Sequence, residues 1–470
     1  MTREPVTMGI DVGTTRIKAE VVALDRRELH AAATATPWRH TSDGTQAQVD
    51  ELGDAAIAVA AEAAEWAAAH GFHVAAMAVT GMAETGALLD GEGCALAPAF
   101  AWHHTMGDPV RVQDSLGRER FMAVTGRDCT ISPSIIKLDM LRTSGHRFSP
   151  GQRWLNIPDY VAYRLSGVQA AEISTSSRTG LVDIARREWW DAALEFLGAG
   201  RWLLPGDLVP GGTLLGPTAG DLPESLRGIQ VSTGGHDHPV AGIGAGASEP
   251  GCLILSLGTA EAQLRIVAPP MSPRTVLQVV AGGGTVDWHP LGDRLTVLGA
   301  LPTGITLERL SGVLRCTTLE ERLGLSRTAL ECEPHGGAPR LDGVTFDSFN
   351  LIGIADGVTA PAVWRGANED LIDISTALTR RVNEAIGPYD DAVAFGGWLA
   401  DPLVRALRQR QLGVRATFTS LAEPGAVGAA MLAAWAAGEI SQLPGTHEVG
   451  VHLSEPTSGK GGTIASQRGR

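Results

Sequence analysis

Ile10-Asp11-Val12-Gly13-Thr14-Thr15 and Leu255-Ser256-Leu257-Gly258-Thr259-Ala260 follow one pattern, in which an apolar strand runs into a Gly-Thr turn. Each turn leads into a second stretch rich in strand-forming residues, at 17–24 and at 262–267. A tight glycine turn exposes backbone N–H groups, and the threonine adds a hydroxyl donor. Either hairpin alone is typical of an ordinary β-turn. The matched pair, half a chain apart, predicts a repeated architecture whose two turns grip a polyphosphate from both sides.

The chain length and the order of secondary-structure signals predict an α/β protein with two domains. At 470 residues the chain exceeds one typical domain. Strand-like stretches at 253–257, 262–267 and 392–395 mix with helical patterns at 367–386, 400–412 and 424–437. A stretch rich in Gly and Pro ends the first half at 246–251. We therefore predict an N-terminal domain at 1–246, a C-terminal domain at 247–440 and a polar tail at 441–470, with a cleft between the domains.

Local signals inside the first domain predict several of its elements. An Ala-rich helix is expected over 50–70, with Asp50 or Asp54 as its N-cap. Residues 133–200 are expected to be mostly helical, with breaks at Pro158 and around Gly167. Residues 239–246 are small and apolar, which predicts a tightly packed helix after Asp237.

Composition and charge exclude several classes of partner. The net charge is −14, from 38 basic and 52 acidic residues, which disfavours nucleic acid and anionic membrane surfaces. No apolar run reaches the length of a membrane span, and the first residues lack the apolar core of a signal peptide. The five cysteines are odd in number and form no CxxC pair. We therefore expect a cytoplasmic protein without a disulfide framework or a zinc site.

Asp11 and Lys18 make the first turn chemically different from the second. The Asp11 carboxylate lies just before the turn at Gly13, where it could hold Mg²⁺ beside phosphate oxygens. Ser256 takes the matching place in the second copy and carries no charge. One copy that holds a metal and one that holds only phosphate would suit a single Mg-ATP. Lys18 either reaches the phosphates or is a solvated strand lysine.

Asp237 is the predicted general base. It lies in Thr233-Gly234-Gly235-His236-Asp237-His238, where the glycines let the backbone approach a ligand closely. A carboxylate near a substrate hydroxyl can accept its proton during phosphoryl transfer. Taken alone, an Asp before a helix is more often an N-cap. We expect the flanking histidines to orient groups or line the pocket, although their spacing also suits a metal.

A third cluster predicts the sugar-binding side of the site. Gly81, Met82 and Glu84 follow a strand end, and the Glu84 carboxylate could accept hydrogen bonds from sugar hydroxyls. Trp102 could stack on a sugar face, and His104 lies close to it in sequence. A loop glutamate and a core tryptophan are the plain alternatives.

A double-glycine turn at Gly396 and Gly397 predicts the adenosine side. It follows the strand-like Ala394-Phe395, and a flat ring can lie against glycine backbone where no side chain intervenes. A helix of small residues is expected to start at Pro424. Each of these pieces alone is more typical of a tight turn.

In this order the pieces resemble the FGGY family of carbohydrate kinases, which have the actin-like, ribonuclease H-like ATPase fold. The resemblance runs over about residues 8–440, and its most specific parts are 9–18, 234–242 with 255–259, and 395–397 with 425–430. It implies ATP-dependent phosphorylation of a sugar, polyol or sugar acid, with ATP and Mg²⁺ as cofactors. Asp237 then matches the family's base, and Asp11 and Asp237 its metal-associated carboxylates. The residues matching the ATP site are Gly13, Thr14, Thr15, Lys18, Gly258, Thr259, Gly396 and Gly397. A homodimer is an expectation at the family level only.

Three departures from the family pattern concern the substrate and the second domain. The Trp-x-Asp-x-Arg motif of many members is here Trp102-His103-His104-Thr105-Met106. Asp139 stands where an aromatic residue commonly follows the Lys137 segment. The Gly-Glu-Arg loop is not visible around 335–347. The histidines prompt the hypothesis of a sugar acid or an unusual polyol as acceptor. A sugar-binding or regulatory protein without catalysis, and an actin-like or chaperone-like ATPase, are the alternatives.

Overall fold

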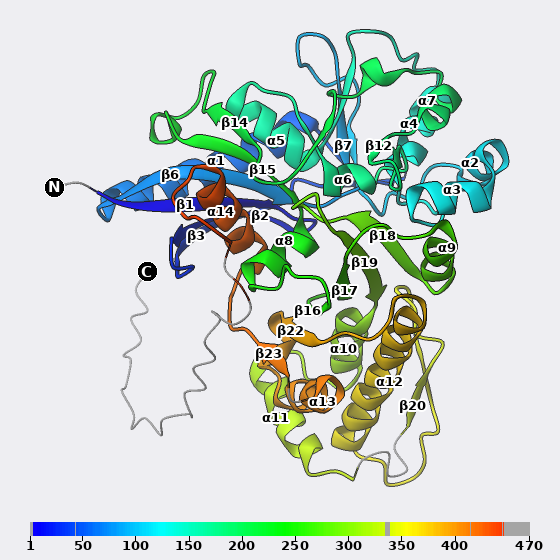
Figure 1. Ribbon diagram of the computed structural model, residues 1–470. Coiled ribbons are helices and arrows are strands. Elements are labelled where there is room, and N and C mark those ends of the chain that lie inside the picture. The colour runs from blue at the N-terminus through cyan, green and yellow to red at the C-terminus, as the bar shows by residue number, and fades with distance from the viewer. Residues whose placement is uncertain (1–2, 43, 334–338, 414, 444, 446–470) are drawn as a thin grey trace.

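The computed structural model describes residues 3–42, 44–333, 339–413, 415–443 and 445, and builds them on two large mixed sheets (Figure 1). The first has the order β14 (Leu214–Pro217), β15 (Gln230–His236), β6 (Phe72–Gly81), β1 (Glu4–Val12), β2 (Arg16–Ala23), β3 (Glu28–Ala35). The second has the order β18 (Gly284–Trp288), β19 (Leu295–Leu301), β17 (Glu261–Val267), β16 (Cys252–Leu257), β22 (Asp391–Phe395), β23 (Ala416–Phe418).

The two sheets share an arrangement of five strands, as the repeated Gly-Thr hairpin predicts, and differ in the sixth, because β14 and β18 lie at opposite edges. In each sheet the hairpin strands, β1 with β2 and β16 with β17, are antiparallel. The first hairpin strand also pairs in parallel with a later strand, β6 in one sheet and β22 in the other. A further strand then extends each sheet in parallel, β15 in the first and β23 in the second. The carboxyl ends of parallel strands meet at one edge of a sheet, and this edge carries the turns predicted to bind phosphate.

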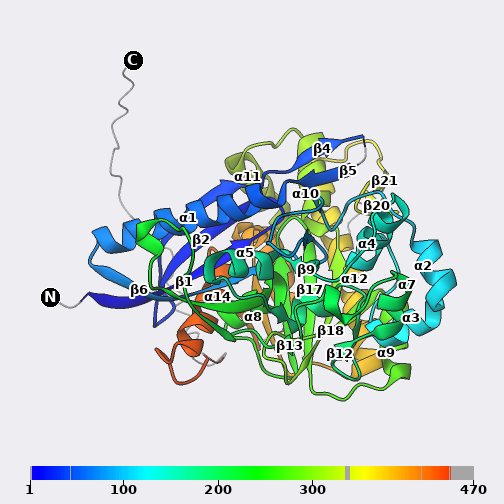
Figure 2. The same ribbon diagram turned by 90° about the horizontal axis from the view of Figure 1, so that it is seen from above.

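Helices cover both faces of the first sheet (Figures 1 and 2). Strand β6 alternates between them: Met77 and Val79 pack with α1 (Val49–Ala69) and α5 (Ile157–Ser166). Ala76 and Ala78 face α8 (Asp237–Gly244) and α14 (Pro424–Ala436). The expected helix at 424–437 therefore exists, but it packs on the first sheet although it follows the last strand of the second. The domain limits proposed above remain a prediction, and this helix crosses back over them.

Small residues let α8 and α14 approach each other backbone to backbone. A Cβ added at Gly428 would lie 1.9 Å from the Val240 carbonyl oxygen, and one at Gly244 would lie 2.2 Å from the Pro424 carbonyl oxygen. Only hydrogen atoms fit at these two crossings. The prediction of a tightly packed helix after Asp237 is confirmed, and its partner is α14.

The remaining helices lie around the two sheets (Figure 1). Their bounds are α2 (Pro109–Leu116), α3 (Arg118–Thr125), α4 (Ser134–Thr143), α6 (Ile173–Ser177), α7 (Asp191–Phe196), α9 (Pro273–Ala281), α10 (Thr303–Val313), α11 (Leu319–Leu330), α12 (Ala360–Ile386) and α13 (Pro402–Leu412). Short 3₁₀ turns lie at η1 (Arg201–Leu203), η2 (Glu224–Leu226) and η3 (Gly397–Ala400). None of the helices in the described ranges is long and apolar enough to cross a membrane.

Short strands form the smaller sheets. These are β4 (Arg39–Thr41) with β5 (Gly44–Ala47) and β8 (Ala99–Phe100); β7 (Gly86–Leu89) with β9 (Arg153–Asn156); β10 (Ala171–Glu172) with β13 (Leu208–Val209); β11 (Val182–Asp183) with β12 (Glu188–Trp189); and β20 (Arg340–Asp342) with β21 (Asn350–Ile352).

Several local expectations are corrected. The N-cap of α1 is Gln48, and Asp50 lies inside the first turn, where an acidic side chain favours the helix dipole. Pro158 does not break a helix but stands in the first turn of α5, where its missing N–H costs nothing. The segment 133–200 also contains four short strands, β9 to β12. Most of the predicted tail, residues 444 and 446–470, lies outside the described residues.

Candidate functional site

The strand register brings Asp11 close to Asp237. On β6, Thr80 is paired with Asp11 of β1 on one side and with Gly235 of β15 on the other. Asp237 follows two residues later as the first residue of α8. Because β1, β6 and β15 are parallel, both carboxylates come from carboxyl strand ends at one edge of the sheet. The two candidate residues, far apart in the sequence, therefore meet by topology.

Burial and nearby negative charges make both carboxylates weak acids: Asp237 raises the pKa of Asp11, and Glu84 raises that of Asp237. Burial raises the pKa of Asp11 to about 7, and the nearby Asp237 charge adds to this rise. Burial also raises the pKa of Asp237 to about 7, against the His238 backbone N–H and Arg178, which lower it. A carboxyl group that titrates near neutral pH is suited to accept a proton and to release it again.

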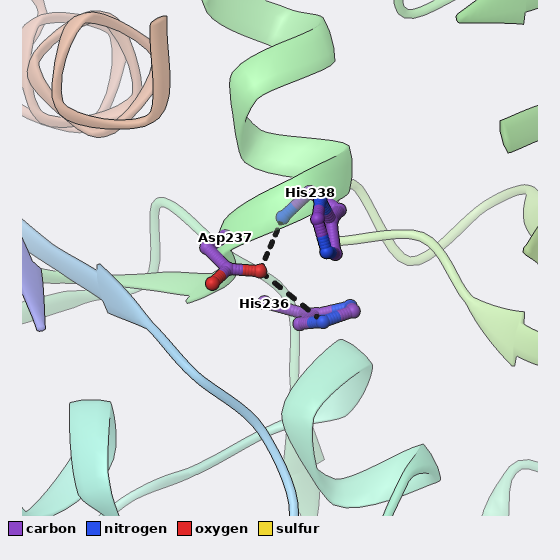
Figure 3. Close-up of side chains that lie close together, drawn as sticks. All are labelled: His236, Asp237 and His238. Atoms are coloured by element: carbon purple, nitrogen blue, oxygen red, sulfur yellow. Dashed lines mark hydrogen bonds and ion pairs between the residues drawn. The ribbon is translucent and has the colours of Figure 1, made fainter. Parts of the chain in front are cut away.

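His236 and His238 flank the Asp237 carboxylate (Figure 3). The His236 Nε2 atom lies 3.3 Å from Asp237 Oδ1, and the His238 backbone N–H donates to the same oxygen at 2.6 Å. Burial, followed by the charge of Arg178, lowers the pKa of His238 to about 4 and that of His236 well below its usual value. Both rings are therefore neutral at pH 7, and the His236 ring and the His238 backbone N–H contact the carboxylate without adding charge. One ligand atom from each of the three residues lies within 4.8 Å of the others, so the set could also hold a metal ion.

The surroundings of Asp11 fit a hard divalent cation. Its Oδ1 atom is buried and has no hydrogen-bond partner among the described residues. A buried carboxylate oxygen without a donor is costly, and a cation would satisfy it. A Cβ added at Gly425 would lie 3.1 Å from Asp11 Oδ2, so the N-terminus of α14 lies beside the same carboxylate. The donor chemistry therefore fits Mg²⁺ at Asp11.

Lys18 does not point freely at this site. Its ammonium group forms an ion pair with Glu423, the N-cap residue of α14. The contact ties β2 to the start of the helix that passes Asp11. Binding of phosphate by Lys18 stays a prediction. In the structure, the ion pair of Lys18 with Glu423 joins β2 to α14.

The glycine N–H closes each of the two Gly-Thr turns, but the hydrogen bond of the first turn spans one residue more than that of the second. The Gly13 N–H donates to the Arg16 carbonyl at 3.1 Å, and the Gly258 N–H donates to the Ala260 carbonyl at 3.1 Å. Thr15 and Thr259 are exposed at the tips. Thr14 is half-buried. The role of Gly13, Thr14, Thr15, Gly258 and Thr259 in binding phosphate stays a prediction.

Glu84 belongs to a buried network of four charges that sequence reasoning missed. Its Oε1 atom lies 3.1 Å from Arg127 and 2.6 Å from Arg178. Asp287 on β18 pairs with the same two arginines, at 2.5 and 2.9 Å. Glu84, Arg127 and Asp287 are at most 5% exposed. The carboxylate predicted to meet sugar hydroxyls is therefore already paired, and the network joins the second sheet to the first half of the chain.

The backbone at Glu84 is held in an uncommon conformation. Its φ of 60° lies in the left-handed region, which non-glycine residues rarely adopt. The two arginine contacts hold the side chain in place. The pKa of Glu84 lies below its usual value, because the attraction of Arg178 and Arg127 outweighs burial, although burial is the largest single effect. Glu84 is therefore an anion that fixes two guanidinium groups near Asp237.

Trp102 connects the substrate-side loop with the first phosphate turn. Its indole Nε1–H donates to Thr14 Oγ1 at 3.0 Å, and 37% of the residue is exposed. Its carbonyl oxygen accepts a hydrogen bond at 3.2 Å from Lys137, and burial lowers the pKa of that ammonium group to about 7. The Trp102 ring can still form a pocket wall, and Lys137 is a loop support that sequence reasoning did not assign.

His104 supports the same loop from within. It is 1% exposed, and its Nδ1 atom lies 3.0 Å from the Thr45 carbonyl oxygen. Its neighbour His103 has a buried Nδ1 atom without a hydrogen-bond partner in the described part of the chain. The geometry therefore favours His103 over His104 as a group with unused hydrogen-bonding capacity.

Gly81 and Met82 line the end of β6 from the core side. Met82 is 2% exposed, and its N–H donates to the Val12 carbonyl at 3.0 Å. The side chain therefore packs inside the sheet edge, and contact of either residue with a substrate stays a prediction.

A cavity of about 350 Å³ lies on the second sheet where the adenosine site is predicted. Gly258 of the second turn and Gly397 both line it, together with Glu308, Leu319, Arg322, Leu323, Trp398, Ala400 and Asp401. The Arg322 guanidinium lies 5.1 Å from the centre of the Trp398 ring. Gly396, with a φ of 114°, makes the turn into η3 at its edge. Residues 334–338, in the segment where no Gly-Glu-Arg loop was visible, lie outside the described residues.

The arginines and Asp287 were missed because their partners are distant in sequence. Arg127 and Arg178 are 160 and 109 residues from Asp287. Arg178 directly follows the run of small hydroxyl residues 174–177, and a charged residue beside such a run is the sequence feature that could have identified it.

The sequence of the chain is similar to those of carbohydrate kinases. Residues 6–244 match the family model described as the N-terminal domain of the FGGY family of carbohydrate kinases. L-fuculokinase of Escherichia coli K12 is 26% identical over 278 residues, 55% of this chain and 56% of that protein. The chain thus spans about half the length of that relative. Xylulose kinase of Streptomyces rubiginosus is 27% identical over 451 residues, 92% of this chain and 88% of that protein.

Solved structures share the two-domain actin-like fold. Xylulose kinase from Rhodospirillum rubrum superposes with a TM-score of 0.80 at 22% identity, covering 92% of this chain and 91% of that chain. Plasmodium falciparum glycerol kinase, solved with ADP, gives a TM-score of 0.83 at 14% identity, covering 94% and 91%. At these identities the likeness concerns the fold alone, and it confirms the predicted fold class.

Proposed function

The chain belongs to the FGGY family of carbohydrate kinases, and we propose that it transfers the γ-phosphoryl group of ATP to a hydroxyl group of a sugar, polyol or sugar acid. The observation that carries this proposal is the pair of half-buried carboxylates, Asp11 and Asp237, at one edge of the first sheet. One acidic group suits a metal and the other a proton, which is the division of labour that phosphoryl transfer needs.

Asp237 acts as the general base in this proposal. The acceptor oxygen forms a bond to the γ-phosphorus, the bond from that phosphorus to the β–γ bridging oxygen breaks, and the acceptor proton passes to Asp237. ADP leaves with the bridging oxygen. A pKa of about 7 keeps a large fraction of Asp237 unprotonated at neutral pH while leaving it basic enough to accept the proton.

Asp11 would hold Mg²⁺, directly or through water. A bound ion would supply positive charge that offsets the charge of the phosphates. The protein itself binds the nucleotide: the Gly-Thr turns offer N–H groups to the phosphates, and the cavity beside Gly397 receives adenosine. Closure of the two halves excludes water, which limits hydrolysis of ATP.

The relatives differ in the acceptor that their names give, and they include an L-fuculokinase, a xylulose kinase and a glycerol kinase. The unpartnered Nδ1 of His103 supports the hypothesis of an acceptor with an extra polar group, such as a sugar acid or an unusual polyol. A cytoplasmic location and a homodimer accompany the proposal as expectations.

ADP release measured over a panel of ketoses, polyols and aldonates tests the activity and the acceptor together. Asp237→Asn should lower kcat by about 10²–10⁴-fold while nucleotide affinity stays within about twofold, because the base contacts the acceptor rather than the nucleotide. The exposed Asp293 supplies the control Asp293→Asn, which should retain turnover. Turnover of Asp237→Asn near that of the control would refute the assignment of the base.

The same panel distinguishes the alternatives. A sugar-binding protein without catalysis would bind a panel member and release no ADP. An actin-like or chaperone-like ATPase would release ADP without any acceptor. Preference for xylulose or glycerol over all other acceptors would refute the argument from the histidine.

A further inference from the structure

The peptide group between Gly235 and His236 is held from both sides by buried hydroxyl groups. Thr80 Oγ1 donates to the Gly235 carbonyl at 2.7 Å. The His236 N–H donates to Ser174 Oγ at 2.9 Å. Both hydroxyl-bearing residues are at most 1% exposed. The two bonds fix the carbonyl and the N–H of a single peptide unit, one residue before Asp237.

This peptide lies at an irregularity of the sheet. Thr233 of β15 is paired with Val79 of β6, and Gly235 is paired with the next residue, Thr80. Two steps along β15 therefore match one step along β6, which is a bulge at Gly234. A bulge redirects the following side chains, and here it sets the direction in which β15 enters α8. Gly235 has a φ of 125°, a conformation that most side chains avoid.

Ser174 can accept from His236 because its own proton is committed elsewhere. Its Oγ–H donates to Glu172 Oε2 at 2.7 Å, which leaves the oxygen lone pairs for the His236 N–H. Glu172 is fully buried and also accepts from the N–H groups of Ser174 and Thr175, at 2.9 and 2.8 Å. These bonds cap α6 and fix the carboxylate. A continuous set of hydrogen bonds thus runs from Glu172 through Ser174 and the peptide group between Gly235 and His236 to Thr80.

We propose that Thr80 and Ser174 are positioning residues that aim Asp237 at the acceptor hydroxyl, with Glu172 orienting Ser174. The proposal rests on the proposed function, in which Asp237 takes the acceptor proton. Proton transfer needs the carboxylate within hydrogen-bond reach of that hydroxyl. A displacement of about 1 Å at such a site costs about 10²-fold in rate. Neither hydroxyl is proposed to touch the substrate, so their effect is carried by the backbone alone.

Thr80→Val tests the carbonyl side, because it replaces the hydroxyl by a methyl group of similar shape. We expect kcat to fall by about 10- to 100-fold. ADP affinity should stay within about twofold, since the nucleotide cavity lies on the second sheet. Thr80→Ser keeps the donor and should restore kcat to within about threefold of the unmodified protein. Thr7→Val is the matched control: Thr7 is also fully buried in the first sheet, and its hydroxyl has no partner among the described residues.

Ser174→Ala tests the N–H side and gives a readout that does not need turnover. The His236 amide should exchange its hydrogen at least about tenfold faster, because it loses its acceptor, and kcat should fall as in Thr80→Val. Thr80→Val with kcat within twofold of the Thr7→Val control, or loss of activity in Thr80→Ser as deep as in Thr80→Val, would overturn the proposal. So would unchanged amide exchange in Ser174→Ala. If the unmodified protein phosphorylates no acceptor, the proposed function fails, and the exchange measurement still decides whether Ser174 holds the peptide.

Discussion

Asp287→Asn removes one charge from the buried network of Glu84, Arg127, Arg178 and Asp287 and should strongly destabilise the protein. Asp287 Oδ1 accepts from Arg127 at 2.5 Å, and Oδ2 accepts from Arg178 at 2.9 Å and from the Thr285 hydroxyl at 2.8 Å. An asparagine offers one acceptor oxygen, and its NH₂ group would face donors. The network then carries an uncompensated positive charge at a site where Asp287 is 2% exposed. Breaking a buried ion pair in this way costs about 3–5 kcal/mol.

Urea unfolding followed by tryptophan fluorescence measures this loss as a lower free energy of unfolding. The control is Asp293→Asn, because Asp293 pairs with Arg294 at 2.7 Å but its side chain is 65% exposed. Exposed pairs contribute about 0–1 kcal/mol, so the control should change little. The double variant Arg127→Met with Asp287→Asn restores neutrality. It should be less destabilised than the sum of the single variants by about 0.5–3 kcal/mol.

A loss below about 1 kcal/mol for Asp287→Asn, equal to that of the control, would refute the reasoning. It would mean that water reaches the network and screens the charge. Additive single and double variants would refute the pairing of Arg127 with Asp287 even if each change were costly alone.

Three further predictions follow from the packing, the titration and the cavity. Gly428→Ala should lower the free energy of unfolding by about 1–3 kcal/mol or more, because the added Cβ would clash with the α8 backbone. Gly312→Ala is the control in the same urea assay: its Cβ would lie in open space, so the variant should be neutral or slightly stabilising. The value of kcat/KM should fall as pH drops below about 7, because Asp237 becomes protonated. The raised pKa values of Asp237 and Asp11 also mean that these groups stabilise the fold below about pH 4 and that this contribution is lost as pH rises to about 7. Thermal melts across this pH range measure the change. Arg322→Ala removes the cation–π contact that holds the Trp398 ring at the cavity wall, and the less ordered wall should weaken ADP binding by about two- to fivefold in a fluorescence titration.

The sequence by itself determined the architecture and the acidic residues at its centre. The repeated strand-turn-strand pattern predicted a repeated architecture, and the two sheets share an arrangement of five strands. Such local patterns are legible because hairpins, glycine turns and helix starts depend on residues close together in the chain. Asp11 and Asp237 could also be identified as candidates, since Asp11 lies at the end of a strand before a turn and Asp237 begins a helix directly after a strand.

Only the tertiary structure decided what surrounds those carboxylates. Glu84 was predicted to face a sugar, but its charge is taken by Arg127 and Arg178, which come from other parts of the chain. The return of α14 to the first sheet depends on close contacts with α8 that no local pattern encodes. Ion pairs and backbone approaches of this kind depend on which elements the fold brings together. Their residues carry no periodic signal, so they become visible only once the strands and helices are in place.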